Sequence, residues 1–327
     1  MTLTEIINSV PFAIVLLVAG FVLLIKGADF FVEGSSGVAK KLRVPSIVIG
    51  LTVVAMGTSL PELAVSTSAG LAGNNSLAIS NVVGSNIFNL MVVVGMCAVM
   101  SPIVVDKVLI KRDIPISIGA AALLLILGII GMQVGVIDAA ILAVLFVAFV
   151  SALVVSALKA RKNGEVEEEE EDEKIRALWA LILFIIGGAA AIICGGTLVV
   201  NSAETIATAF GMDDTLFGLT IAAIGTSLPE LVTSVVAARK GEVELSLGNA
   251  IGSNIFNILL ILGTAGILSP MAMLTENIID IAILIACSLF VWLVAWKKKK
   301  LGRIEGIAMV AVYAAFMAYI VIRNYAM

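Results

Sequence analysis

The sequence predicts an all-α membrane protein of ten transmembrane helices, arranged as two inverted-topology repeats of five with broken central helices. Apolar residues make up 61% of the 327 residues and recur in runs of the ~18 to 20 residues that a spanning helix needs. Lysine and arginine gather in alternate loops, and two polar motifs return at one fixed spacing. These three observations carry the prediction.

The expected spans follow the apolar runs. They lie near residues 10–33, 43–72, 76–100, 114–131, 135–158, 177–202, 215–239, 245–268, 276–296 and 304–322. The first span lacks the basic start and small-residue cleavage site of a signal peptide, so we expect it to stay in the protein. Cys97, Cys194 and Cys287 fall inside apolar spans, which predicts small packing residues and not disulfides or ligands.

The charged residues are distributed unevenly. The net charge of -4 comes from an acidic run at residues 165–173, between the fifth and sixth spans, and the rest of the chain is net basic. Such a run is typical of a solvated linker, with a cation-attracting or calcium-sensing strip as the alternative. We therefore expect a first five-helix repeat at 1–158, an acidic cytoplasmic loop at 159–176 and a second repeat at 177–327.

The basic residues predict the orientation. Of the 20 lysines and arginines, 18 fall in the loops after spans one, three, five, seven and nine, leaving Lys26 and Arg323. The positive-inside rule makes these loops cytoplasmic, so both termini are expected outside the cytoplasm of a multi-pass protein of the cell membrane.

The internal repeat is the most informative feature. "GTSLPEL" at residues 57–63 recurs at 225–231, and "GSNIFN" at 84–89 recurs at 252–257, both at an offset of 168. Five spans per half is an odd number, so the second half must enter the membrane from the opposite side. In such repeats the substrate site is expected near the midplane, where the halves meet.

The first motif places a carboxylate beside a helix break. Pro61 cannot donate a hydrogen bond to the carbonyl of Gly57, so the helix should open and expose backbone carbonyls. Thr58 and Ser59 precede Glu62 by four and three residues, so their oxygens can share its face of the helix. The second copy offers Thr226, Ser227 and Glu230. Two buried carboxylates facing each other without a basic partner would repel, and a cation between them resolves the conflict.

The second motif adds neutral oxygens. Ser85 and Asn89, and likewise Ser253 and Asn257, form pairs four residues apart on a helix face. Ca²⁺ takes about six to eight oxygens and fits two carboxylates with carbonyls, whereas Mg²⁺ prefers to keep its waters. Neutral oxygens beside the central pair could hold Na⁺. A packing seam of small residues is the alternative, and duplication of both motifs argues against it.

The first span also carries Lys26, Asp29 and Glu33 at helical spacing. Lys26 and Asp29 can pair across one turn. We expect a structural or entrance-lining role for this group and not direct ion ligation.

With these residues in place, the chain resembles the cation/calcium antiporter superfamily, most closely its prokaryotic sodium/calcium exchangers. The resemblance rests on "GTSLPE" followed by "GSN" in both halves and covers essentially the whole chain. It implies exchange of about three Na⁺ for one Ca²⁺ by alternating access, with spans one and six sliding across a core of spans two, three, seven and eight. It implies a calcium site at Glu62, Glu230 and the backbone oxygens of Thr58 and Thr226. The sodium sites it implies draw on both glutamates and on Ala55, Ser59, Ser85, Ala223, Ser227 and Ser253.

One departure from the family pattern bears on the ions. Many members carry aspartate at the last position of the second "GSN" motif, where this chain has Asn257, matching Asn89 in the first half. Two negative charges still balance Ca²⁺, and three Na⁺ would leave one excess positive charge, consistent with electrogenic exchange. A Ca²⁺/H⁺ antiporter and a K⁺-dependent exchanger on the same scaffold remain the alternatives.

Other functional classes fit less well. A channel needs a continuous path, whereas broken helices in an inverted repeat suit alternating access. An intramembrane enzyme would need a base or nucleophile motif that the sequence lacks. We expect no enzyme activity, no cofactor, no nucleic-acid partner and a monomer in the lipid bilayer that transports Ca²⁺ and Na⁺.

Overall fold

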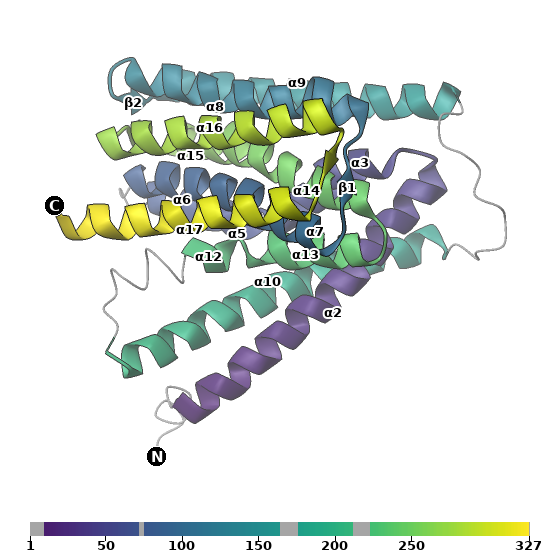
Figure 1. Ribbon diagram of the computed structural model, residues 1–327, viewed down its shortest axis with the longest axis horizontal. Helices are drawn as coiled ribbons and strands as arrows, with labels where there is room; N and C mark the ends of the chain where they lie inside the picture. The colour runs from purple at the N-terminus through teal and green to yellow at the C-terminus, as the bar shows by residue number, and fades with distance from the viewer. Residues whose placement is uncertain (1–9, 72–74, 164–175, 212–222, 327) are drawn as a thin grey trace.

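The computed structural model describes residues 10–71, 75–163, 176–211 and 223–326, and their apolar runs form helices (Figure 1). A helix satisfies its own backbone hydrogen bonds, which lipid cannot do for it. The first half comprises α2 (Val10–Leu42), α3 (Ser46–Ile49), η1 (Gly50–Val54), α4 (Ala55–Thr58), α5 (Leu60–Leu71), α6 (Asn75–Phe88), η2 (Asn89–Val93), α7 (Val94–Met100), β1 (Ile103–Val104), η3 (Leu109–Asp113), α8 (Ile114–Ile129), β2 (Gln133–Val134) and α9 (Val136–Asn163).

The described elements of the second half follow the same order, with the single helix α16 standing where the first half has η3 and α8. It comprises α10 (Leu178–Ala209), α12 (Ala223–Thr226), α13 (Leu228–Arg239), α14 (Val243–Phe256), η5 (Asn257–Ile261), α15 (Leu262–Leu268), β3 (Met271–Ala272), α16 (Thr275–Lys298), β4 (Lys300–Leu301) and α17 (Arg303–Ala326). The η elements are π-helical turns, which are rare and are frequent at functional sites. Two of these turns, η2 and η5, begin 168 residues apart and so occupy matching positions of the two halves.

The predicted spans can be compared with these helices. Among the described residues, eight helices are long and apolar enough to cross a membrane, and a ninth span is a pair, 46–58 and 60–69, bent by 47°. This bend confirms the expected break in the second span. The seventh expected span begins at residues outside those described, and the whole acidic run at 165–173 lies outside them as well.

Two predicted boundaries were wrong. The first and sixth spans were expected to end near residues 33 and 202, but α2 continues to Leu42 and α10 to Ala209. The cause in α2 is tight packing of its small residues: a Cβ added at Gly34 would lie 2.8 Å from the Leu181 carbonyl oxygen of α10. Contact with a neighbouring helix thus keeps a polar, glycine-rich stretch helical, which its composition alone does not predict.

The two long helices α2 and α10 cross closely and lie side by side across one face of the molecule (Figure 1). Glycines allow this approach: a Cβ at Gly195 would lie 2.7 Å from the Gly20 carbonyl oxygen, and one at Gly188 would lie 2.7 Å from that of Gly27. Gly188 and Gly195 stand 168 residues after Gly20 and Gly27. The crossing is therefore built from matching positions of the two halves.

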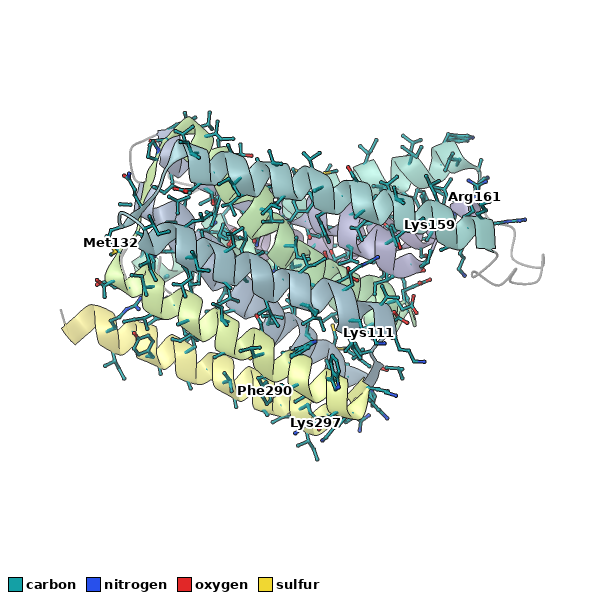
Figure 2. The ribbon with its side chains drawn as sticks, turned by 90° about the horizontal axis from the view of Figure 1, so that it is seen from above. Lys111, Met132, Lys159, Arg161, Phe290 and Lys297 are labelled. Atoms are coloured by element: carbon teal, nitrogen blue, oxygen red, sulfur yellow. The ribbon has the colours of Figure 1, made fainter. Side chains whose placement is uncertain are left out.

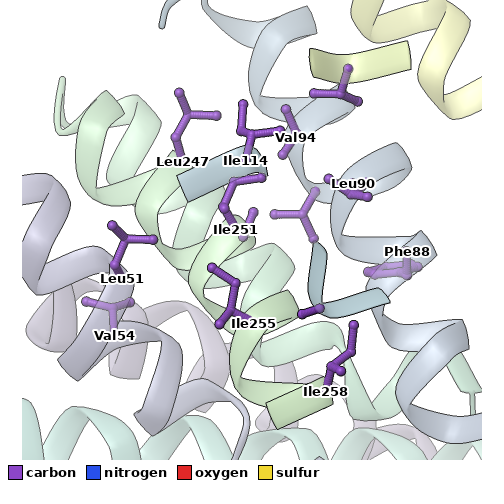
Figure 3. Packing of buried hydrophobic residues seen from close by; sticks show 14 of the residues in the cluster. Leu51, Val54, Phe88, Leu90, Val94, Ile114, Leu247, Ile251, Ile255 and Ile258 are labelled. Carbon is purple, nitrogen blue, oxygen red and sulfur yellow. The ribbon is translucent and has the colours of Figure 1, made fainter. Parts of the chain in front are cut away.

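The core lies in the helices that carry the second motif. In the spans 78–100 and 243–268, 78% of the most apolar window is buried, against 22% in α2, α9, α10 and α17. Ile251, Ile255 and Ile258 pack there in one cluster with Leu51 and Leu90 (Figure 3). The motif-bearing helices are thus shielded from lipid by the peripheral ones.

Short two-stranded ribbons close opposite ends of the molecule. β1 pairs with β4, aligning Ile103 with Leu301, and β2 pairs with β3, aligning Val134 with Met271. β1 and β2 lie at opposite ends in Figure 1. Strands β1 and β3 each follow a Ser-Pro pair and are offset by 168 residues, yet they belong to ribbons at opposite ends. These ribbons were not predicted from the sequence.

Basic residues of three predicted loops lie toward one end of the molecule. Lys111, Lys159, Arg161 and Lys297 lie toward the same end in Figure 2, whereas Met132 lies at the other. The end of the molecule that carries Lys111 and Lys297 is thus opposite the end that carries Met132 and strand β2.

The cysteines divide into two kinds. All three are free; Cys97 and Cys287 are buried, as predicted, and the Cys97 sulfur accepts a hydrogen bond from the Ser246 hydroxyl at 3.3 Å. Cys194 is exposed on α10, so the expectation that it packs inside was wrong. An apolar helix that faces lipid exposes small apolar residues without penalty, which sequence hydrophobicity does not distinguish from burial.

Candidate cation site

The site begins where the first motif interrupts a helix. α4 ends at Thr58, Ser59 adopts φ -86° and ψ 8°, and α5 starts at Leu60. In the second copy, Ser227 has φ -95° and ψ 6° between α12 and α13. Proline at the second position of each new helix needs no donor there, so Pro61 and Pro229 start a helix after the break.

Each serine at a break contacts the glutamate of the other half. The Ser59 hydroxyl donates to Glu230 Oε1 at 2.9 Å, and the Ser227 hydroxyl donates to Glu62 Oε1 at 3.2 Å. Both glutamates are completely buried. Each glutamate thus accepts a hydrogen bond from the helix break of the other half, and each of these serines bonds to the opposite half and not to the glutamate of its own motif. Only the tertiary fold determines this pairing.

Several oxygens around the glutamates are buried and have no hydrogen-bond partner among the described residues. They are Glu62 Oε2, Glu230 Oε2, Ser85 Oγ, Ser253 Oγ, Asn89 Oδ1 and Asn257 Oδ1. A buried oxygen without a donor costs free energy, and a buried charge costs more. All belong to the residues predicted from the two motifs, so the motif positions supply a set of unpaired oxygen acceptors.

The threonines contribute differently. The Thr58 hydroxyl donates to the Val54 carbonyl at 3.1 Å and lies 3.0 Å from Asn249 Oδ1, so it is engaged within the protein. Thr226 is partly exposed at the end of α12. Ala55 is buried at the start of α4, and Ala223 begins α12.

Sequence reasoning missed a pair of asparagines behind the site. The Asn249 amide donates to the Ser234 hydroxyl at 2.9 Å, and in the first half the Asn81 amide donates to the Ser66 hydroxyl at 3.2 Å. Both pairs keep the offset of 168. Comparing the halves residue by residue beyond the motifs would have found them.

Two further asparagines join the halves. Asn86 Nδ2 donates to the Asn254 backbone oxygen at 3.0 Å, and Asn254 Nδ2 donates to the Asn86 backbone oxygen at 3.1 Å. Each bond is the repeat counterpart of the other. These bonds hold α6 against α14 beside the second motif.

The donor set limits the ions that can bind. Within the described residues, no three His, Cys, Asp or Glu side chains come together as a metal centre. Two carboxylates with hydroxyl and amide oxygens instead suit a hard cation such as Ca²⁺ or Na⁺, whereas softer metals prefer sulfur or imidazole.

The charged group of α2 lies at one edge of this assembly. Lys26 Nζ is 3.9 Å from Asp29 Oδ2, so the predicted pair is confirmed. Asp29 also pairs with Lys240 at 3.4 Å, and Glu33 accepts from Arg176 at 2.9 Å. Lys240 and Arg176 were not predicted as partners, because only the fold brings them to α2.

Comparison with known proteins extends this picture. A family model described as "Sodium/calcium exchanger protein" matches residues 12–155 and again residues 179–322. The chain belongs to this family. The resemblance stated from the motifs is thereby confirmed, and the protein is an integral membrane member of a family of transporters.

Two relatives of this exchanger-family protein match it over nearly their whole length. CaxA of Alkalimonas amylolytica is 38% identical, with 94% of this chain and 97% of CaxA covered. The sodium/calcium exchanger MaX1 of Methanosarcina acetivorans is 34% identical, with 94% of this chain and 98% of MaX1 covered. A solved structure of the sodium-calcium exchanger NCX_Mj superimposes with a TM-score of 0.83 at 34% identity, covering 95% of this chain and 99% of that one.

Proposed function

We propose that this protein exchanges Na⁺ for Ca²⁺ across the cell membrane by alternating access. One observation carries the proposal: the broken helices of the two halves meet at two buried glutamates, each with one oxygen bound to a serine of the other half and one oxygen unpaired. A carboxylate in the membrane interior is costly unless it has a partner. A transported cation is that partner.

The proposed scaffold has ten spans in two inverted repeats, 1–158 and 177–327, joined by the acidic loop 159–176. It is supported by counterpart strands β1 and β3, which lie in ribbons at opposite ends of the molecule. The end that carries Lys111 and Lys297 is assigned to the cytoplasm, which leaves both termini outside.

The proposed Ca²⁺ site consists of Glu62, Glu230 and the backbone oxygens of Thr58 and Thr226. Sodium ligands are drawn from the same glutamates and from Ala55, Ser59, Ser85, Ala223, Ser227 and Ser253, with the Asn89 and Asn257 oxygens as neutral additions. Two carboxylates balance one Ca²⁺, and three Na⁺ would carry one further positive charge. Exchange of these ions is therefore proposed to be electrogenic.

The moving part is proposed to be the pair α2 and α10. Their glycine crossing leaves less than 3 Å between an added Cβ and the facing backbone, so the proposal treats these closely packed helices as one moving unit. Each helix lies against the first motif of one half, because a Cβ added at Gly57 would meet Phe31 of α2 and one added at Gly225 would meet Val200 of α10. Sliding of this pair would therefore change which end of the site is covered.

The test uses proteoliposomes loaded with Na⁺ and diluted into Na⁺-free medium with labelled Ca²⁺. We expect Ca²⁺ uptake driven by the outward Na⁺ gradient, abolished in Glu62→Gln and in Glu230→Gln. Glu244→Gln is the matched control, because Glu244 lies exposed on α14 and its loss removes the same charge. Uptake driven by a pH gradient alone would contradict sodium coupling and favour the Ca²⁺/H⁺ alternative.

Two further conditions separate the remaining alternatives. A requirement for K⁺ on the Ca²⁺ side would identify a K⁺-dependent exchanger. Ca²⁺ flux that ignores the direction of the Na⁺ gradient and does not saturate would identify a channel.

A further inference from the structure

The Asn86 side chain connects the two halves through both ends of its amide. Its Nδ2 donates to the Asn254 backbone oxygen at 3.0 Å, and its Oδ1 accepts from Asn257 Nδ2 at 3.0 Å. A backbone carbonyl can only accept a hydrogen bond, so the nitrogen of Asn86 must face Asn254. The oxygen of Asn86 must then face Asn257.

This arrangement determines the orientation of the next amide. Because Asn86 presents an oxygen, the end of Asn257 that faces it must be the NH₂ group. The other end of Asn257 is Oδ1, which is buried and has no hydrogen-bond partner among the described residues. A bare oxygen at that position attracts a cation, whereas an inverted amide would present hydrogens to it.

Asn89, the counterpart of Asn257 in the first half, has no neighbouring side chain in the described part of the chain that determines the orientation of its amide. Asn89 stands 168 residues before Asn257, and both ends of its amide are buried without a partner within the described ranges. Asn254, the counterpart of Asn86, leaves its own Oδ1 unpaired. Identical motifs therefore produce one amide of fixed orientation and one without such a constraint.

We propose that Asn86 is a positioning residue that fixes the Asn257 amide with its Oδ1 toward the transported cation, and so makes the two asparagine positions of the site inequivalent. The inference rests on the proposed function in taking Na⁺ as a cation bound there. Asn86 itself does not touch the ion. Its effect is preorganisation, which strengthens binding by removing a competing side-chain orientation.

The experiment compares Asn86→Ala with Asn254→Ala. Both residues are buried, and each donates one amide hydrogen bond to the backbone of the other. Only Asn86 also accepts from Asn257. We expect both variants to lose similar thermal stability, while Asn86→Ala alone raises the half-maximal Na⁺ concentration for Ca²⁺ exchange by about fivefold, equal to ~1 kcal/mol.

A third variant separates orientation from packing. Asn86→Asp keeps an oxygen facing Asn257 Nδ2, so its half-maximal Na⁺ concentration should return to within about twofold of the wild-type value or fall below it. If Asn86→Ala does not fold, Asn86→Ser takes its place with the same expected shift. Equal shifts in Asn86→Ala and Asn254→Ala, or no shift in either, would overturn the proposal.

A binding measurement distinguishes failure of this inference from failure of the proposed function. Na⁺ that binds the folded protein raises its apparent Tm in detergent with a concentration dependence that reports affinity, whether or not Ca²⁺ is exchanged. Absence of Na⁺-driven Ca²⁺ uptake in the wild type would refute the exchange function. A wild-type Na⁺ titration that matches the Asn86→Ala titration would refute the role of Asn86.

Discussion

The crossing of α2 and α10 makes a quantitative prediction about Gly188. A Cβ built there would lie 2.7 Å from both the Gly27 carbonyl oxygen and the Phe31 backbone nitrogen, and 2.8 Å from the Phe31 Cβ. Ordinary contact begins at 3.4 Å, so the helices must separate by 3.4 − 2.7 = 0.7 Å at this point. A gap of that size forfeits about a quarter to a half of the dispersion energy of the contacts around it.

The expected effect of Gly188→Ala follows from two opposing contributions. Overpacking costs about 1–3 kcal/mol, and it is partly offset by the ~1 kcal/mol that alanine gains over glycine in a helix. We expect a net destabilisation of about 1 kcal/mol, which lowers the apparent Tm by ~2 °C in a protein of this size. The assay is thermal unfolding of the detergent-purified protein, followed by intrinsic fluorescence.

Gly187 is the matched control for this prediction. It precedes Gly188 on α10, and a Cβ added there meets nothing within 4 Å. Gly187→Ala should therefore keep or raise the apparent Tm through helix propensity alone. If the two alanine variants unfold at the same temperature, the close glycine crossing does not constrain this helix pair and the reasoning fails.

Two ion pairs give further predictions. Lys240→Gln removes the pair with Asp29, which is partly exposed and worth less than ~1 kcal/mol, so the apparent Tm should hardly change. This pair joins the proposed moving helix α2 to the end of α13, so we expect Lys240→Gln to change the rate of Ca²⁺ exchange in proteoliposomes. The double variant Asp29→Lys with Lys240→Asp should restore that rate. An unchanged rate in Lys240→Gln would contradict this role. Arg323→Gln leaves the Asp280 carboxylate, 9% exposed, without its two hydrogen bonds of 2.8 and 3.0 Å, and should destabilise the protein by about 3 kcal/mol. Denaturant or thermal unfolding measures this loss of stability. A decrease of less than ~1 kcal/mol in the free energy of unfolding would show that the Asp280 carboxylate is solvated.

The sequence predicted what depends on periodicity and repetition. Apolar run length located the spans, Pro61 located the bent span, and the offset of 168 identified the buried glutamates. It could not predict which hydroxyl would meet which carboxylate, because Ser59 is three residues from Glu62 along the chain yet bonds to Glu230. Local spacing describes one helix, and this contact is set by how two helices cross.

The same limit explains the other missed features. The Lys240 contact with Asp29 and the ribbons of β1 with β4 and β2 with β3 join residues far apart in the chain. None of them leaves a periodic signal. The orientation of the Asn257 amide depends on a hydrogen bond to Asn86 in the other half, so identical motifs could not reveal that the two copies differ.

The reciprocal bonds of Ser59 with Glu230 and Ser227 with Glu62 bear on how such a protein can change over generations. If the halves descend from one duplicated gene, neither copy holds a complete site, so neither could diverge at these positions alone. A substitution at a serine in one half alters the surroundings of the acid in the other. Substitutions at the serines and glutamates that bond across the two halves are therefore expected to occur together. Substitutions on the lipid-facing surfaces of each half are expected to occur independently.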